Sequence, residues 1–219
     1  MKVSVIIPAY NEYQTIEKII NKVIQTKLNL QLIVIDDFSN DGTRDILLKK
    51  CKHLIDEIIL HDKNLGKGAA IKSAQKKVQG DCVIIQDADL EYDPSDYSKL
   101  LEPFKDKNIN VVYGSRVLGR DIKKKLSSIQ KYRIFGNYLL TKLSNIINSQ
   151  KLTDAHTCYK IFRKNIFLGL KICEDDFSFC PEVTTKLSNI NEKITEVAIS
   201  YQGREIEEGK KIRFSDALK

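Results

Sequence analysis

The stretch "VIIQDADLEYDP" (residues 83–94) joins an apolar run to a dense group of carboxylates. The apolar residues predict the end of a buried strand, and the carboxylates follow at alternate positions, Asp87, Asp89, Glu91 and Asp93. Alternate side chains of an extended segment share one face, and like charges at that spacing raise one another's pKa and destabilise the fold. The pattern therefore indicates a site that holds a cation. A solvated acidic turn before a helix is the alternative, but one carboxylate suffices to cap a helix.

Upstream of this stretch, apolar runs typical of buried strands alternate with segments of helical spacing. Strands are expected at 3–10, 30–37, 55–62 and 82–89, and helices at 11–27, 43–52 and 64–78. Such alternation predicts an α/β fold with a mostly parallel sheet that is flanked by helices. Ligands of these sheets bind beyond the carboxyl ends of the strands. The polar clusters at 10–12, 36–37 and 87–91 all follow expected strands, so we expect the site at that edge.

The second half is less regular. A helix is expected over 96–104 and a strand over 110–116, and further apolar segments follow at 158–164 and 194–204. Between them, residues 119–133 carry six Lys or Arg and one Asp, and an amphipathic stretch follows at 135–147. A basic run beside an amphipathic helix favours docking on an anionic membrane surface. An ordinary helix that faces the core is the alternative.

Composition narrows the classes of function. The chain has 219 residues, 42% of them hydrophobic and 30% charged, which fits one globular domain. The net charge of +7 admits nucleic acid, an anionic membrane or phosphorylated small substrates, or it only keeps lysine-rich helices soluble. Acidic clusters at the strand ends would repel a nucleic-acid backbone, so we expect no nucleic-acid partner.

The cysteines and the apolar runs bear on the cellular location. The five cysteines form no CxxC pair and with the three histidines form no zinc pattern, which favours reduced thiols in a cytoplasmic protein. No signal peptide is visible, and no apolar run approaches the ~18 residues of a transmembrane helix. We therefore expect a cytoplasmic protein, peripheral on the cytoplasmic face of the membrane if it docks there.

Short motifs run in order along nearly the whole chain: "VIIPAYNE" (5–12), "DDFSNDGT" (36–43), "NLGKGAAI" (64–71), "DADLEYDP" (87–94), "GSR" (114–116), "RIFGN" (133–137), "EV" (182–183) and "EVAISYQGREIEEGKK" (196–211). Together they resemble glycosyltransferase family 2, most closely the branch that moves a sugar from a nucleotide-sugar to a polyprenyl or dolichyl phosphate. The resemblance implies one GT-A domain over 1–219, Rossmann-like, with a nucleotide-sugar half over about 1–116 and an acceptor half over about 117–219.

The resemblance answers the question of the cation. Mg²⁺ or Mn²⁺ would bridge carboxylates and the donor diphosphate, since hard cations prefer such oxygens. By resemblance Asp89 is the main metal ligand and Glu91 a second one, while Asp87 joins the metal site or contacts the ribose.

The resemblance also assigns the donor site. Pro8, Tyr10 and Glu12 would line the base and ribose pocket, and Asp37 would hold the base or ribose. The glycines of "NLGKG" would allow close backbone approach to a phosphate, beside Lys67 as a diphosphate contact. Arg204, Lys210 and Lys211 resemble a C-terminal loop that closes over diphosphate and acceptor.

On the acceptor side, Arg116, Arg133 and Asn137 resemble the residues that hold the lipid phosphate. The implied reaction is metal-dependent and inverting, with Asp89, Arg116 and Arg204 as catalytic residues and GDP-mannose favoured over a UDP-hexose. A phosphate acceptor is already anionic and needs no base. The alternative is transfer to a sugar hydroxyl, which needs a general base, and Asp175, Asp176 and Glu182 are the candidates. A nucleotidyltransferase is disfavoured because "AYNEYQT" is not a GxGTR-type loop.

Overall fold

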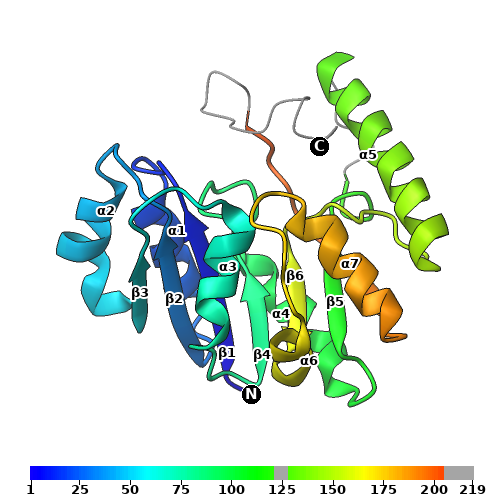
Figure 1. The fold of residues 1–219 in the computed structure, drawn as a ribbon, viewed down its shortest axis with the longest axis horizontal. Helices are drawn as coiled ribbons and strands as arrows, with labels where there is room; N and C mark the ends of the chain where they lie inside the picture. Colours follow the sequence, from blue (N-terminus) through cyan, green and yellow to red (C-terminus); the bar gives the residue numbers. More distant parts are fainter. Residues whose placement is uncertain (121–127, 205–219) are drawn as a thin grey trace.

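A seven-stranded sheet forms the centre of the protein in the computed structural model, which describes residues 1–120 and 128–204 (Figure 1). The strand order is β3-β2-β1-β4-β6-β5-β7. The strands are β1 (Val3–Ala9), β2 (Leu30–Asp36), β3 (Glu57–Leu60), β4 (Cys82–Ile85), β5 (Val111–Ser115), β6 (Lys160–Arg163) and β7 (Ile194–Ala198).

The pairings confirm the predicted mostly parallel α/β sheet. Strands β1, β2, β3 and β4 pair in parallel, and β5 pairs in parallel with β7. Strand β6 runs antiparallel between β4 and β5. The other six strands therefore end at one common edge, the upper edge in Figure 1.

Helices cover both faces of the sheet, as predicted. In Figure 1, α3 and α7 lie in front of the strands and α1 lies behind them. The α-helices are α1 (Ile16–Gln25), α2 (Thr43–Ile46), α3 (Lys67–Gln75), α4 (Tyr97–Leu101), α5 (Ser128–Asn148), α6 (Lys164–Gly169) and α7 (Phe179–Asn189). Shorter turns of other helix types span Leu47–Cys51, Lys52–Leu54, Pro94–Asp96 and Glu102–Lys105.

Two elements are shorter at the site than the sequence predicts, because α1 begins later and β4 ends earlier, and both leave loops there. Helix α1 begins at Ile16 instead of residue 11, because Asn11 adopts a left-handed φ of 51° that a helix cannot contain. Strand β4 ends at Ile85, and a turn follows in which Leu90 has a φ of 65°. The expectation that the carboxylates at 87–93 alternate along an extended segment is therefore wrong.

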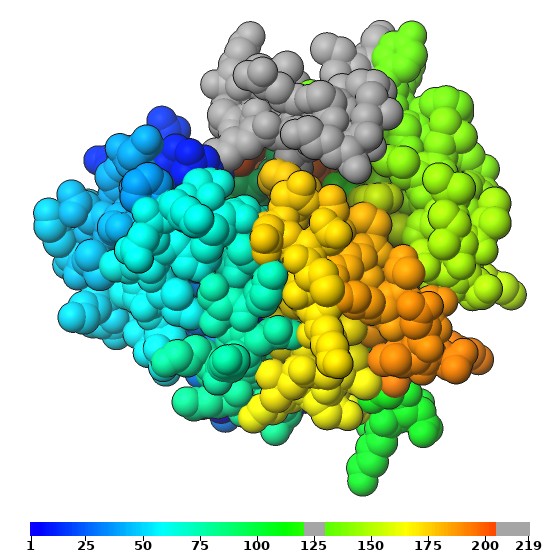
Figure 2. Space-filling model, in the orientation of Figure 1, coloured from blue at the N-terminus to red at the C-terminus, as the bar shows by residue number. Residues whose placement is uncertain are grey.

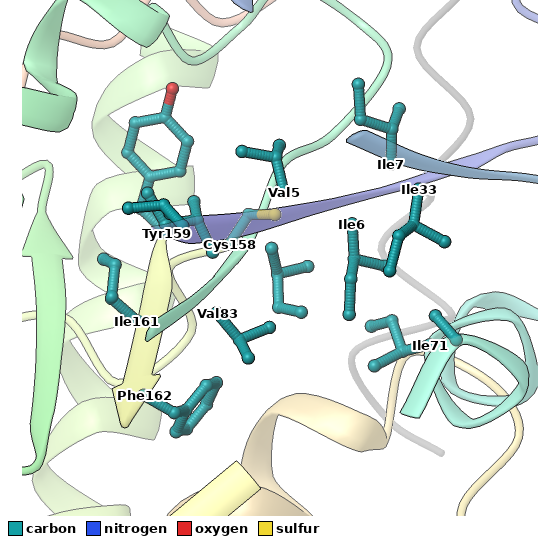
Figure 3. Packing of buried hydrophobic residues seen from close by; sticks show 14 of the residues in the cluster. Val5, Ile6, Ile7, Ile33, Ile71, Val83, Cys158, Tyr159, Ile161 and Phe162 are labelled. Carbon is teal, nitrogen blue, oxygen red and sulfur yellow. The ribbon is translucent and has the colours of Figure 1, made fainter. Parts of the chain in front are cut away.

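The core that fixes this edge is made of branched aliphatic side chains. Figure 3 shows Ile6 of β1 on the same side as Ile71 of α3, with Val83 of β4 beside them. All three are fully buried, and burial of each such side chain stabilises the fold by about 1.5–3 kcal/mol. β-Branched residues suit the central strands because they pack well on a pleated surface.

Helix α5 exposes its apolar face, whereas an ordinary surface helix buries it. Its sheltered side is polar: Asn145 exchanges two hydrogen bonds with the backbone of Leu152, and Thr141 accepts one from the amide of Ala155. Seven of its large apolar side chains are at least half exposed: Tyr132, Phe135, Tyr138, Leu139, Leu143, Ile146 and Ile147. The alternative that this apolar stripe faces the core is therefore wrong.

Helix α5 forms the right flank of the molecule in Figure 2. Neither it nor any other helix within residues 1–120 and 128–204 is long and apolar enough to cross a membrane.

Candidate active site

The predicted site residues gather at the carboxyl edge of the sheet. Three segments matter: the acidic turn (residues 87–91) after β4, the end of β5 at Arg116, and the C-terminal strap (residues 199–204) after β7. The strap crosses to the acidic turn, where Tyr201 pairs with Tyr92 and the amide of Gln202 donates to the carbonyl of Glu91. The sheet thus brings together residues more than a hundred positions apart.

The acidic turn contains three of the four clustered carboxylates. Asp89 accepts a hydrogen bond from the amide of Glu91 at 3.0 Å, which closes the turn. Asp93 lies apart, because its carboxylate pairs with Lys22 and caps the following turn at Ser95. Asp93 therefore caps a helical turn. The sequence analysis considered this role as the alternative to a cation site for all four carboxylates.

Asp87 and Lys67 form an ion pair at the base of the turn. The Lys67 ammonium lies 2.5 Å from the Asp87 carboxylate and 3.3 Å from the Cys158 thiol. Burial opposes the charge of Lys67, but the nearby Asp87 raises its pKa well above the usual value. Lys67 is therefore a fixed cation that partly neutralises the turn.

The other two carboxylates contact the strap. Glu91 accepts hydrogen bonds from the Tyr201 hydroxyl and the Arg204 amide, both at 2.7 Å. The Arg204 guanidinium lies 3.3 Å from Asp89 and 3.3 Å from both oxygens of Glu12. Among the residues described, no three carboxylates, histidines or cysteines converge on one point as metal ligands do.

The turn still carries an excess of negative charge. Burial, followed by the charges of Asp87 and Glu91, raises the pKa of Asp89 to about 7. The donor set of carboxylate oxygens suits a hard divalent cation. The buried Nε of Arg204 has no hydrogen-bond partner among residues 1–120 and 128–204, and it suits an oxygen of a bound anion. The residues therefore fit a divalent cation together with an anionic ligand.

Gln86, which the sequence analysis missed, supports the acidic turn from below. Its side-chain amide donates to the carbonyls of Asp87 and Tyr92, at the two ends of the turn. Its carbonyl oxygen accepts the hydroxyls of Tyr97 and Tyr159, each at 2.7 Å. A glutamine at the end of an apolar strand was the available signal, because a buried amide must find partners for all its polar atoms.

The predicted base and ribose residues lie around the end of β1. Pro8 is within the strand, Tyr10 follows it with a ring 38% exposed, and Glu12 is buried. The loop is tied to the turn after β2, since Asn11 accepts from the amide of Asn40 and Thr43 accepts from the amide of Glu12. Tyr10 thus presents a flat ring at the site edge, a surface suited to stacking on a base.

Asp37 is buried, and its carboxylate organises the neighbouring loop. It accepts hydrogen bonds from the amides of Leu65 and Gly66 at 2.9 and 2.8 Å, and it lies 2.7 Å from the His61 ring. His61 was not singled out from the sequence. The role of Asp37 in holding the base or ribose stays a prediction.

The glycines of "NLGKG" allow the close approach of another part of the backbone, and their approach to a phosphate stays a prediction. A Cβ on Gly66 would overlap the carbonyl oxygen of Asp175, and one on Gly68 would overlap that of Glu174. Gly66 also has a φ of 96°, which side chains rarely adopt. These glycines therefore join the start of α3 to the segment before α7.

Arg116 and Asn137, which the resemblance predicts to hold the acceptor phosphate, meet at a carboxylate that the sequence analysis did not identify. Asp154 accepts two hydrogen bonds from the Arg116 guanidinium, both at 2.7 Å, and one from Asn137 at 3.1 Å. Arg133 lies four residues before Asn137 on α5 and is exposed. The Arg116 guanidinium also lies over the Tyr201 ring at 5.2 Å. Tyr201 thus touches both the acidic turn and the acceptor arginine.

The loop from Asp154 to Cys158, called the floor loop below, connects Arg116 with the residues at the base of the acidic turn. Its first residue holds Arg116, and its last contacts Lys67 through the thiol and Tyr92 through the amide. Lys160, fully buried, anchors the loop by donating to the carbonyls of Ala155 and Thr157. No motif marks this loop in the sequence, and only the polar cluster "TDAHT" within an apolar region signals it.

Beside Arg116, a hollow of about 330 Å³ opens between the segment after β5 and helix α5. Its lining is mostly apolar, with two basic residues: Val117, Arg120, Lys131, Ile134, Phe135, Tyr138 and Thr153.

The candidate bases for a hydroxyl acceptor are each engaged elsewhere. Asp175 pairs with Lys72 at 2.7 Å. Glu182 accepts from the amides of Cys173 and Glu174 and pairs with Lys186, and Asp176 caps the turn at Ser178. Lys210 and Lys211, predicted to contact the donor, lie outside the described residues.

Residues 4–169 match the model of glycosyl transferase family 2. The chain belongs to glycosyl transferase family 2. Among curated relatives, a dolichol-phosphate mannosyltransferase of Pyrococcus furiosus is 28% identical over 92% of this chain and 56% of its own length. A dolichyl-phosphate β-glucosyltransferase, ALG5A, of Trichomonas vaginalis is 26% identical over 99% of this chain and 69% of its own.

The hexosyltransferase Agl6 of Haloferax volcanii, which acts in low-salt glycan biosynthesis, is 26% identical over 92% of this chain and 48% of its own length. The chain thus spans about half to two thirds of the length of these relatives.

Solved structures confirm the GT-A fold. Glucosyl-3-phosphoglycerate synthase of Mycobacterium tuberculosis, in complex with Mn²⁺ and UDP, superposes with a TM-score of 0.70 at 17% identity over 94% of this chain and 74% of its own. The mannosyltransferase PcManGT of Pyrobaculum calidifontis, in complex with GDP-Man and Mn²⁺, superposes with a TM-score of 0.64 at 18% identity, over 92% of this chain and 57% of its own.

Proposed function

We propose that this chain transfers a sugar from a nucleotide-sugar to a polyprenyl phosphate, with a divalent cation and with inversion at the anomeric carbon. The observation that carries the proposal is the placement of the acidic turn and of the Arg116–Asn137 pair on either side of Tyr201. A cation site beside a separate site for an anion is what a diphosphate donor and a phosphate acceptor require. Relatives named for dolichyl-phosphate and undecaprenyl-phosphate transfer support the same acceptor class.

Mg²⁺ or Mn²⁺ would be held by Asp89, with Glu91 and Asp87 as further ligands. When bound, the cation neutralises the diphosphate and stabilises it as a leaving group. The two solved relatives that bind Mn²⁺ support this assignment. The raised pKa of Asp89 supports it too, since burial and then the charges of Asp87 and Glu91 disfavour a bare carboxylate there, and a bound cation would stabilise it.

The donor would lie over the ends of β1 and β2, in the half formed by about residues 1–116. Pro8, Tyr10, Glu12 and Asp37 would surround the base and ribose. Lys67 would act through Asp87, and Lys210 and Lys211 would meet the diphosphate. GDP-mannose is the favoured donor on the resemblance to mannosyltransferases, and a UDP-hexose is the second choice.

The acceptor half, about residues 117–219, would hold the lipid phosphate with Arg116, Arg133 and Asn137. The hollow beside α5 would take the first apolar units of the lipid. A phosphate monoester is already anionic and can attack the anomeric carbon without a protein base. The task of Arg116 and Arg204 is then to hold two mutually repelling phosphate groups in line and to stabilise the developing charge.

Transfer to a sugar hydroxyl is the second candidate. It requires a general base within reach of the hydroxyl. Asp175, Asp176 and Glu182 each already have partners in the protein, so the structure favours the phosphate acceptor.

We also propose that α5 docks on an anionic membrane surface, which makes the protein peripheral. The helix exposes seven large apolar side chains, and Lys131, Arg133 and Lys142 are exposed on the same helix. An apolar stripe with flanking basic residues is the arrangement of interfacial helices, and each basic residue near the surface adds roughly 1 kcal/mol. Docking through α5 would place the hollow beside this helix at the membrane, which contains the polyprenyl phosphate.

The test is the release of nucleotide from GDP-mannose or UDP-glucose with a short polyprenyl phosphate, beside the matched polyprenol that lacks the phosphate. The proposal predicts that only the phosphate stimulates release, and that EDTA abolishes the stimulation. Equal stimulation by polyprenol would overturn the phosphate-acceptor assignment.

A further inference from the structure

The carboxylate of Asp154 is the shared anchor of two acceptor residues. It is fully buried between the end of β5 and helix α5. Oδ2 accepts from the backbone amide and the Nε of Arg116, at 3.0 and 2.7 Å, and Oδ1 accepts from the Nη2 of Arg116 and the amide of Asn137, at 2.7 and 3.1 Å. Four hydrogen bonds thus converge on one side chain, from residues that would bind the same phosphate.

We infer that Asp154 is the positioning residue of the acceptor site, which sets the orientation of Arg116 relative to Asn137. The inference rests on the proposed function, because it presumes that these two residues bind the acceptor phosphate. Asp154 itself is buried and does not touch the acceptor.

The geometry of Arg116 carries the first step. Its guanidinium has five N–H groups, and Asp154 engages the edge formed by Nε and Nη2. The Tyr201 ring covers one face at 5.2 Å. The planar group is therefore fixed in tilt and rotation, and Asp154 leaves the Nη1 donors of Arg116 available for another acceptor such as a phosphate oxygen.

The negative charge of Asp154 gives the second reason for a positioning role. A carboxylate beside an anion site weakens binding by simple repulsion, so electrostatic attraction alone would favour an Arg116 without a partner. A buried aspartate at this position favours binding only by orienting Arg116. A guanidinium held in one orientation can align a phosphate, and a mobile one cannot. Burial alone would raise the pKa of Asp154, but the hydrogen bonds and charge of Arg116 bring it below its usual value, so the pair stays ionised.

The anchor is itself firmly held. Glu196 of β7 accepts from the amides of Thr153 and Asp154, at 2.7 and 3.0 Å. The next residue, Ala155, is bound through its carbonyl by the buried Lys160. Asp154 therefore connects β5, β7 and α5, and the position of Arg116 depends on all three.

The experiment measures acceptor and donor KM separately, in the full chain with a short polyprenyl phosphate. Asp154→Asn keeps the shape and removes the charge, and the acceptor KM should rise about 10- to 100-fold, while the donor KM stays at its wild-type value. Asn137→Ala, which leaves no buried charge unpaired, should raise the same KM by less. Asp36→Asn is the matched control, because Asp36 is an equally buried aspartate paired with an arginine, Arg44, away from the acceptor residues.

A double-mutant cycle separates positioning from simple damage to the fold. In an Arg116→Met background, Asp154→Asn should change the acceptor KM much less than in wild type, since only the contact of Asp154 with Asn137 is left to lose. An unchanged acceptor KM in Asp154→Asn, or an equal rise in donor KM, would overturn the inference alone. Wild-type protein that gives no product with any polyprenyl phosphate would overturn the proposed function, and this inference with it.

Discussion

The guanidinium of Arg204 lies 3.3 Å from the carboxylate of Asp89, in the position where a cation would neutralise the acidic turn. It also contacts Glu12, and its backbone amide donates to Glu91. The protein therefore places a positive charge of its own beside the turn. A divalent cation that enters must share or displace this contact.

Replacement of Arg204 should strengthen metal binding and weaken turnover. In Arg204→Ala we expect Mn²⁺ to bind the free protein about five-fold tighter, because loss of the ion pair removes about 1 kcal/mol of competition. Turnover should fall about 100-fold, because the same guanidinium would stabilise the leaving diphosphate. Calorimetric titration with Mn²⁺ measures the first effect and a nucleotide-release assay the second.

Lys22→Ala is the control for this pair of measurements. Lys22 pairs with Asp93, the carboxylate that lies apart from the acidic turn. Its removal should leave both Mn²⁺ binding and turnover unchanged. Weaker Mn²⁺ binding in Arg204→Ala than in wild type would show that Arg204 is no competitor of the cation.

His156, in the floor loop, should make stability depend on acid pH. Burial, with help from the charge of Lys160, lowers its pKa from 6.5 to about 4. The unfolded chain then binds the proton more readily than the folded one between these values, so stability is complete above pH about 6.5 and is lost as pH falls toward about 4. The loss should be about 1–3 kcal/mol, after allowance for partial exposure.

The measurement is urea denaturation at pH 7 and pH 5, for wild type and for His156→Gln. The variant should lose less stability than wild type over this interval. The exposed His53 provides the control, since His53→Gln should follow the wild-type curve. If His156→Gln and wild type lose the same stability, the histidine does not titrate as its surroundings require.

Two glycines should respond in opposite directions to the same substitution. Gly68→Ala would place a methyl group against the carbonyl oxygen of Glu174, and it should destabilise the fold by about 1–3 kcal/mol. Gly136→Ala lies on helix α5 with no atom within 4 Å of the added carbon, and it should stabilise the helix by about 0.5–1 kcal/mol. Free energies of unfolding from urea titrations compare the two. Equal effects would argue against the close packing of α3 on the segment before α7.

Helix α5 should bind membranes through its apolar face. Leu143→Glu combined with Ile146→Glu should abolish sedimentation with vesicles that contain anionic lipid, and it should leave the melting temperature unchanged because these side chains are 55% and 77% exposed. Leu48→Glu, at an exposed leucine of the Leu47–Cys51 turn, is the control and should still sediment. Wild-type protein that binds neither anionic nor neutral vesicles would exclude docking through α5.

The sheet and the edge that bears the site could be predicted from the sequence. The run 82–85 is apolar throughout and the run 3–9 is apolar except for Ser4, and only a strand buried on both faces fits such runs beside helical segments. Once the sheet is parallel, the acidic clusters at the strand ends must meet. The family motifs then supplied the roles of residues such as Asp89 and Arg116.

The finer geometry could not be predicted, for separate physical reasons. The acidic turn depends on a left-handed Leu90, a conformation that leucine rarely adopts and no local pattern indicates. Arg116 and Asp154 form a pair although they lie 38 positions apart in the sequence, and no local pattern at either residue indicates its partner. The periodicity of α5 shows that one face is apolar but not which face is turned inward, because that depends on the polar partners offered by residues such as Leu152 and Asp154.

The most direct test of the central claim is mass spectrometry of the lipid product. Wild-type protein would be incubated with Mn²⁺, a short polyprenyl phosphate and, in parallel, GDP-mannose, UDP-glucose or UDP-N-acetylglucosamine. We predict a glycosyl-phosphoryl-lipid from one donor, absent with EDTA and with Asp89→Asn. Slow release of nucleotide with no lipid product from any donor would contradict the account and direct attention to a hydroxyl acceptor.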